Sequence, residues 1–145
     1  AYLHDCAKDI PEKMKIRFCK EFHIPLDKWI EKNIELCHSF LGAEIAKREY
    51  GIIDEEILNA IRYHTTGRKN MTDLEKLIYL ADYIEPNRNY FQGLESIREY
   101  ARKDLNQAMI FALTNTIEYV KKNKGILHPL TLEALEDLKS KKGDQ

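Results

Sequence analysis

Apolar residues recur along most of this chain at intervals of three and four positions, which is the spacing of one face of an α-helix. Alternation of polar and apolar residues, typical of strands, is never sustained, and the Asn-Gly and Asp-Gly pairs of tight hairpins are missing. The pattern predicts helices at residues 12–22, 26–32, 39–50, 54–64, 72–85, 94–102, 104–122 and 131–141. The predicted fold class is therefore all-α, an irregular single-domain helical bundle.

Several helix ends carry their own local signals. Thr72 followed three residues later by Glu75 is a capping box, so a helix is predicted to begin at Thr72. Asp54 is the expected N-cap of the helix predicted at residues 54–64. Gly51 and Gly125 follow predicted C-terminal ends, where a left-handed residue is common. The last three residues, 143–145, are expected to fray.

Four aromatic residues stand at helical spacings in two predicted helices, namely Tyr79, Tyr83, Phe111 and Tyr119. We interpret them as core residues, because large apolar side chains on one helical face usually pack inward. For Tyr83, stacking on a nucleotide base is the alternative.

Composition narrows the class of protein. At 145 residues, with 43% hydrophobic and 32% charged residues, the chain fits one globular domain. A formal net charge of −1 argues against a nucleic-acid partner bound through a basic face. No apolar run approaches the roughly 18 residues of a membrane span, and the first residues lack a secretory pattern. Three cysteines without a C-x-x-C pair favour a cytoplasmic location and a structural role, although Cys37 beside His38 leaves a soft-metal ligand open.

The adjacent pair His4-Asp5 is the first candidate for chemistry. Imidazole and carboxylate together are ligands of iron, manganese and zinc centres, but one such dipeptide is a weak signal. Asp82 lies inside an apolar stretch, where a carboxylate needs a cation; the alternatives are a metal ion or an arginine such as Arg62 or Arg88. His64 stands near a helix end, where an interaction with the helix dipole is the simpler interpretation.

Four segments carry a family resemblance: residues 3–8 (LHDCAK), 59–68 (NAIRYHTTGR), 79–88 (YLADYIEPNR) and 127–129 (LHP). They resemble the HD-domain metal-dependent phosphohydrolases and, within them, the bacterial symmetrical diadenosine tetraphosphate hydrolases of the YqeK type. The resemblance covers nearly the whole chain. It implies an HD-type helical bundle that cleaves diadenosine tetraphosphate into two ADP with a metal-activated water.

The resemblance also implies roles for individual residues. A pair of divalent ions, most commonly iron with manganese or zinc as alternatives, would be held by His4, Asp5, His38, His64 and Asp82, with Asp5 bridging. Asp5, Lys8 and His64 would be catalytic. The implied substrate-binding residues are Lys8, Thr65, Thr66, Arg88, Ile126, Leu127 and His128.

The chain departs from the family pattern in two places. The family has a histidine on a helix before the His-Asp pair, and Ala1 to Leu3 have the apolar character of a helix interior. We therefore expect residues 1–145 to be an HD domain that lacks its first helix and, with that helix, the upstream histidine ligand. Ser39-Phe40 after His38 replace the usual small or rigid residues.

Alternatives stay open for individual residues and for function. His128-Pro129 is also consistent with a simple turn before a helix. The expected partner is a small-molecule nucleotide, with no nucleic acid and no membrane, and a homodimer is left open. The alternative functions are hydrolysis of another nucleotide by the same centre, or a non-catalytic nucleotide-binding module.

Overall fold

A computed structural model describes residues 1–143, and this part of the chain is helical without a strand. The helices are α1 (Glu12–Glu21), α2 (Lys28–Lys32), the 3-10 helix η1 (Ile34–Leu36), α3 (Cys37–Glu49), α4 (Glu55–Arg62), α5 (Asp73–Tyr83), α6 (Leu94–Ala101), α7 (Leu105–Lys122) and α8 (Pro129–Gly143). The all-α prediction is confirmed. The chain end at 143–145 was expected to fray. Gly143 is instead the last residue of α8, and residues 144 and 145 lie outside the described residues.

The helix ends with strong local signals lie where the sequence predicts them. At the start of α5, the Glu75 N–H donates to Thr72 Oγ1 at 3.3 Å and the Thr72 N–H donates to Glu75 Oε2 at 2.6 Å, which completes the capping box. The Asp54 carboxylate accepts the first free N–H groups of α4. Gly51 takes the left-handed conformation (φ 66°) after α3. These boundaries follow from local chemistry alone.

Two predictions for segments that carry candidate ligands are wrong. Because η1 leads directly into α3, that helix begins at Cys37, and His38 lies inside its first turn rather than before it. Residues 1–5, expected to be helical, form successive tight turns in which the N–H groups of His4, Cys6 and Lys8 donate to the carbonyls three residues earlier.

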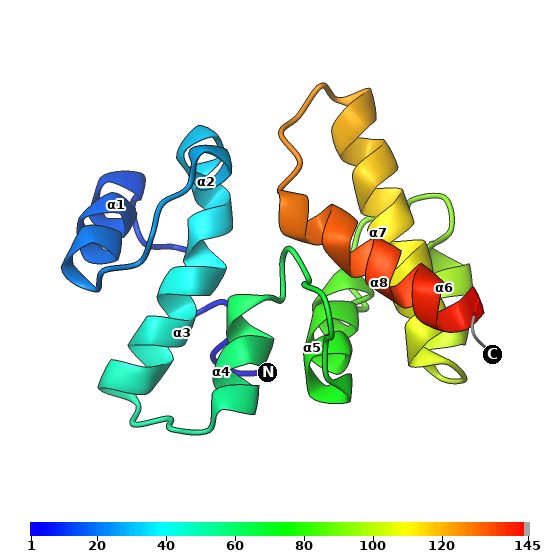
Figure 1. Cartoon of the computed structure of the whole chain (residues 1–145), viewed down its shortest axis with the longest axis horizontal. Coiled ribbons are helices and arrows are strands. Elements are labelled where there is room, and N and C mark those ends of the chain that lie inside the picture. The colour runs from blue at the N-terminus through cyan, green and yellow to red at the C-terminus, as the bar shows by residue number, and fades with distance from the viewer. Residues whose placement is uncertain (144–145) are drawn as a thin grey trace.

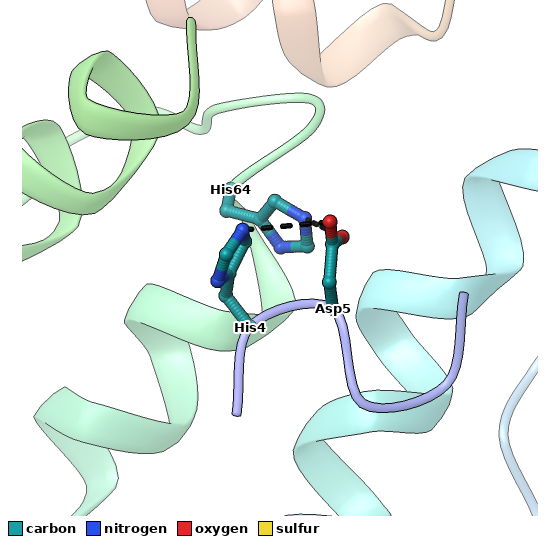
Figure 2. A group of neighbouring side chains, drawn as sticks. All are labelled: His4, Asp5 and His64. Carbon is teal, nitrogen blue, oxygen red and sulfur yellow. Dashed lines mark ion pairs between the residues drawn. The ribbon is translucent and has the colours of Figure 1, made fainter. Parts of the chain in front are cut away.

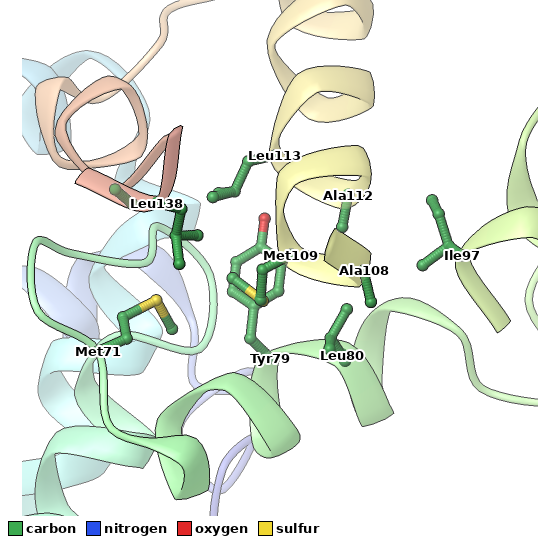
Figure 3. Close-up of a cluster of buried hydrophobic side chains, with 10 residues drawn as sticks. Met71, Tyr79, Leu80, Ile97, Ala108, Met109, Ala112, Leu113 and Leu138 are labelled. Atoms are coloured by element: carbon green, nitrogen blue, oxygen red, sulfur yellow. The ribbon is translucent and has the colours of Figure 1, made fainter. Parts of the chain in front are cut away.

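The helices form two halves, as Figure 1 shows: α1 to α4 on one side and α5 to α8 on the other. The larger core, drawn in Figure 3, joins α5, α7 and α8 through side chains such as Tyr79, Met109 and Leu138. The N-terminal half has smaller clusters around Leu41 and Leu58. Helix α4 packs against both α3 and α5, so its C-terminal end, which precedes His64, lies where the halves meet.

The prediction that four aromatic residues pack in the core is half right. Tyr79 is buried, and Tyr83 is partly buried with its hydroxyl accepting from the Asn115 amide at 2.8 Å. Phe111 and Tyr119 are 40% and 68% exposed, so their assignment to the core is wrong. The face of α7 that packs inward is instead formed by the residues Ala108, Met109, Ala112, Leu113 and Ile117.

None of the helices in the described part of the chain is both long enough and apolar enough to cross a bilayer.

The capping box predicts a measurable stability effect. Thr72→Ala should lower the free energy of unfolding by about 1 kcal/mol, because the Glu75 N–H loses its acceptor at the start of α5. Urea denaturation measures this change. Thr72→Ser keeps the hydroxyl and should stay close to the wild type; an equal loss in both variants would contradict a capping role.

Candidate metal centre

The carboxylate of Asp5 lies at the centre of a histidine cluster between the two halves of the molecule. The Nε2 atoms of His38 and His64 lie 3.3 and 3.4 Å from Asp5 Oδ1. His4 Nε2 lies 3.6 Å from Asp5 Oδ2. Figure 2 shows His4, Asp5 and His64 converging from the N-terminal turns and from the end of α4. These three residues place ligand atoms within 4.8 Å of one another, close enough to hold a metal ion.

Each histidine of the cluster is fixed by the same backbone contact. The Nδ1 atoms of His4, His38 and His64 contact the carbonyl oxygens of the residues three positions earlier, Ala1, Glu35 and Ile61. A carbonyl only accepts, so Nδ1 carries a hydrogen, and in the neutral ring Nε2 then keeps its lone pair. This is the tautomer of a metal-binding histidine whose other nitrogen is held by the protein.

The fit to a cation follows from what these lone pairs face. With neutral rings, three Nε2 lone pairs surround a carboxylate that is itself only an acceptor, and Nε2 of His38 lies 3.3 Å from Nε2 of His64. Among the described side chains, Asp5 Oδ1 is one of two buried polar atoms without a hydrogen-bond partner. Acceptors facing one another in a buried site repel unless a cation lies between them. The donor set therefore fits a divalent metal.

The two oxygens of Asp5 face different groups, as a bridging ligand requires. Oδ1 faces His38 and His64, whereas Oδ2 faces His4. His4 Nε2 is also 3.5 Å from Asp82 Oδ1, so Asp82 joins the cluster on the Oδ2 side. All five residues predicted as ligands from the sequence are therefore brought together.

Asp82 also has the arginine partner that the sequence left open. Arg88 Nη2 lies 3.6 Å from Asp82 Oδ2 and donates to the Asp82 carbonyl at 2.6 Å. Arg62, the other candidate, contacts Asn59 and Glu44 instead. Because Arg88 uses Oδ2 and His4 faces Oδ1, the two interpretations of Asp82 are compatible.

Burial and charge set the protonation of the cluster. Burial lowers the pKa of His64, and the neighbouring rings of His38 and His4 lower it further. His64 is thus neutral near pH 7 and able to bind a metal. Burial alone would raise the pKa of Asp5, but the hydrogen bond from the Lys8 ammonium lowers it, and the net shift is downward. Asp5 is therefore an ionised carboxylate.

Two cationic side chains lie next to the cluster, and both are substrate-binding residues that the family resemblance implies. Lys8 Nζ donates to Asp5 Oδ2 at 2.6 Å, and its side chain is 53% exposed. Arg88 is partly exposed, and its Nε is the second buried polar atom without a partner among the described side chains. Each cation can therefore contact an anion on its free side.

The remaining predicted substrate residues differ in accessibility. Thr65 is partly buried, and Thr66 is buried with its hydroxyl donating to the Gly67 carbonyl. Ile126 and Leu127 are half-buried in the loop between α7 and α8. His128 is buried, and its ring contacts Asp27 rather than the metal cluster.

Some residues that shape the site could not be recognised from the sequence. Ser39 is buried, and its hydroxyl is 3.0 Å from that of Thr65, which ties α3 to the segment after His64. A serine beside a candidate ligand gives no signal by itself. Cys37, the open soft-metal alternative, has its sulfur 2.6 Å from that of Cys19. Both thiols are fully buried, in accord with the structural interpretation.

Comparisons with known proteins agree with this geometry. The HD domain family model matches residues 1–87. The symmetrical bis(5'-nucleosyl)-tetraphosphatase of Bacillus subtilis is 47% identical over 132 residues, 90% of this chain and 69% of that protein. A protein of the same name from Halalkalibacterium halodurans is 44% identical over 95% of this chain and 73% of its own length.

A solved structure is also similar. The crystal structure of a predicted HD superfamily hydrolase involved in NAD metabolism from Clostridium acetobutylicum superposes with a TM-score of 0.91 at 45% identity, covering 96% of this chain and 73% of that one. A helical bundle that brings histidine and carboxylate side chains together is a common architecture for a protein metal site. The chain belongs to the HD-domain family, and within it to the group of the symmetrical bis(5'-nucleosyl)-tetraphosphatases.

Proposed function

We propose that this protein hydrolyses diadenosine tetraphosphate symmetrically to two molecules of ADP at a two-metal centre. The observation that carries the chemistry is the convergence of three Nε2 lone pairs on the ionised carboxylate of Asp5, whose buried Oδ1 has no hydrogen-bond partner among the described residues. The substrate is supported by the names of the relatives at 44% and 47% identity.

Two ions would share these ligands, and the two oxygens of Asp5 face different groups of them. His38 and His64 with Asp5 Oδ1 would hold one ion, and His4 and Asp82 with Asp5 Oδ2 the other. Iron is the proposed metal; manganese and zinc suit the same imidazole and carboxylate ligands.

The protein's side chains have separate tasks in this reaction. Two metal ions, when bound, would supply an activated water near neutral pH and polarise the phosphoryl oxygens. The carbonyls of Ala1, Glu35 and Ile61 keep the three imidazoles oriented, so the centre needs little reorganisation. Lys8 and Arg88 lie where they can bind the phosphate chain and stabilise the charge that develops on the departing ADP. Water adds to one inner phosphorus and ADP leaves, so both products are ADP.

We also propose roles for the other predicted substrate residues and a cellular location for the enzyme. Thr65 borders the phosphate chain, with Thr66 supporting it from the buried side, and the loop carrying Ile126 and Leu127 contacts a nucleoside. A cytoplasmic location is supported by the three cysteines, which are free thiols.

Product analysis tests the function directly. The protein loaded with metal should convert diadenosine tetraphosphate to two equivalents of ADP, measured by chromatography, and a chelator should abolish the reaction. AMP plus ATP would disprove symmetrical cleavage. Turnover of another nucleotide alone would retain the centre and replace the substrate. Tight ADP binding without any turnover would indicate a binding module.

A further inference from the structure

The loop between α7 and α8 is fastened to the N-terminal half by one buried contact. His128 Nε2 lies 2.9 Å from Asp27 Oδ2, although the two residues are 101 positions apart. His128 is only 6% exposed. In Figure 1 this loop, in orange, lies on the edge of the C-terminal half that faces α2. We call the Asp27–His128 pair the latch.

The hydrogen bonds of the latch fix its protonation. The Leu130 N–H donates to His128 Nδ1 at 3.2 Å, so the ring hydrogen is on Nε2 and donates to Asp27 Oδ2. Asp27 Oδ1 accepts the N–H groups of Trp29 and Ile30, both at 2.9 Å, as the N-cap of α2. Both ring nitrogens of His128 are therefore used inside the protein, which leaves neither free for a nucleotide.

The latch is connected to the metal centre through packed aromatic rings. The His128 ring lies 6.3 Å from the ring of Phe40, and Phe40 lies 6.1 Å from Tyr63, edge to face. Phe40 follows His38 by two positions in α3, and Tyr63 precedes His64. The position of the loop is thus tied to the segments that carry two of the predicted ligands.

We infer that Asp27 is a positioning residue: through His128 it holds loop residues 125–127 against the N-terminal half, where they border the nucleotide site. The inference rests on the proposed function for the identity of the substrate. In this arrangement His128 acts on the substrate indirectly, by fixing Ile126 and Leu127. Without the latch the loop is free to move, and a bound nucleotide must order it again.

Asp27→Asn separates the latch from the helix cap. Asparagine keeps Oδ1 for the N-cap but presents an N–H group to the Nε2–H of His128, and the ring cannot change tautomer because Leu130 needs Nδ1 as acceptor. We expect KM for diadenosine tetraphosphate to rise about tenfold, the size of one hydrogen bond to a charged group, with kcat within about twofold. Asp27→Ser, which still caps α2 but is too short to reach His128, should give the same split and guards against a folding defect in the first variant.

Asp54→Asn is the matched control. Asp54 caps α4 with the same geometry, is exposed and has no histidine partner among the described residues, so KM should not change. Combining Asp27→Asn with His128→Ala should add little to either single change, since the two residues act as one unit. A loss of kcat at constant KM, or an equal effect of Asp54→Asn, would overturn the inference.

A measurement without substrate distinguishes this inference from the proposed function. Amide hydrogen exchange at residues 125–128 should become faster in Asp27→Asn and stay unchanged in Asp54→Asn. Unchanged exchange in Asp27→Asn would reject the latch even in an active enzyme. Faster exchange in a protein that does not cleave diadenosine tetraphosphate would support the latch and reject the substrate.

Discussion

Asp5→Asn should lower kcat by about 10³-fold or more and remove bound metal, while leaving the metal-free protein as stable as the wild type. The loss of activity follows because Asp5 is the residue that faces every histidine of the cluster, and one well-placed electrostatic group contributes up to this amount. Kinetics and elemental analysis of the purified protein measure the two losses together.

The stability part of this prediction runs against the usual effect of deleting an ion pair. In the metal-free protein, three Nε2 lone pairs face the Asp5 carboxylate. An asparagine amide can donate to one of them and relieves the repulsion. The substitution also breaks the ion pair with Lys8, but that pair is half exposed and contributes little to stability. Metal should therefore raise the melting temperature of the wild type and leave that of Asp5→Asn unchanged.

Asp9→Asn is the control for net charge. It removes a carboxylate four residues away that is exposed, and it should retain metal and activity. If Asp5→Asn bound metal normally, or if the metal-free variant unfolded at a much lower temperature, the cluster would be a structural network rather than a metal centre.

Local chemistry explains which parts of this fold could be predicted. The capping box at Thr72 and the N-cap at Asp54 depend on residues within one turn, and both predictions are confirmed. Lys15 shows the opposite case: its side chain is 2% exposed, while the neighbouring Met14 is 44% exposed. The partner of Lys15 is Glu35, twenty positions away, and no local pattern identifies it.

The candidate metal centre also has features that the sequence predicts and features that it does not. Residue types and their family pattern were enough to name the five candidate ligands, and the structure brings all five together. The division of the ligands between Oδ1 and Oδ2 of Asp5 could not be foreseen, because it depends on how three separate segments pack. Helical spacing likewise could not tell that Phe111 lies on the outer face of α7, since a helix can turn either face to its neighbours.

Arg68→Met should lower the free energy of unfolding by about 3 kcal/mol or more. This is the largest effect on stability that we expect from a single substitution. Arg68 holds Glu75 with two hydrogen bonds, Nε to Oε1 at 2.7 Å and Nη2 to Oε2 at 3.1 Å. The Glu75 side chain is completely buried, so removing Arg68 leaves a charge without a counterion inside the protein. Urea denaturation measures the loss.

A second substitution separates the cost of the bare charge from the value of the pair. Adding Glu75→Gln to Arg68→Met removes the buried charge but keeps an oxygen that accepts the Thr72 N–H, so the capping box survives. The double variant should recover most of the lost stability, because replacing both partners of a buried pair is far less costly than removing one. Lys103→Met, which breaks an exposed pair with Glu99, should cause no measurable change. If the double variant were as unstable as Arg68→Met alone, the contacts of the guanidinium, including its stacking over Tyr63, would be what holds the segment after His64 in place.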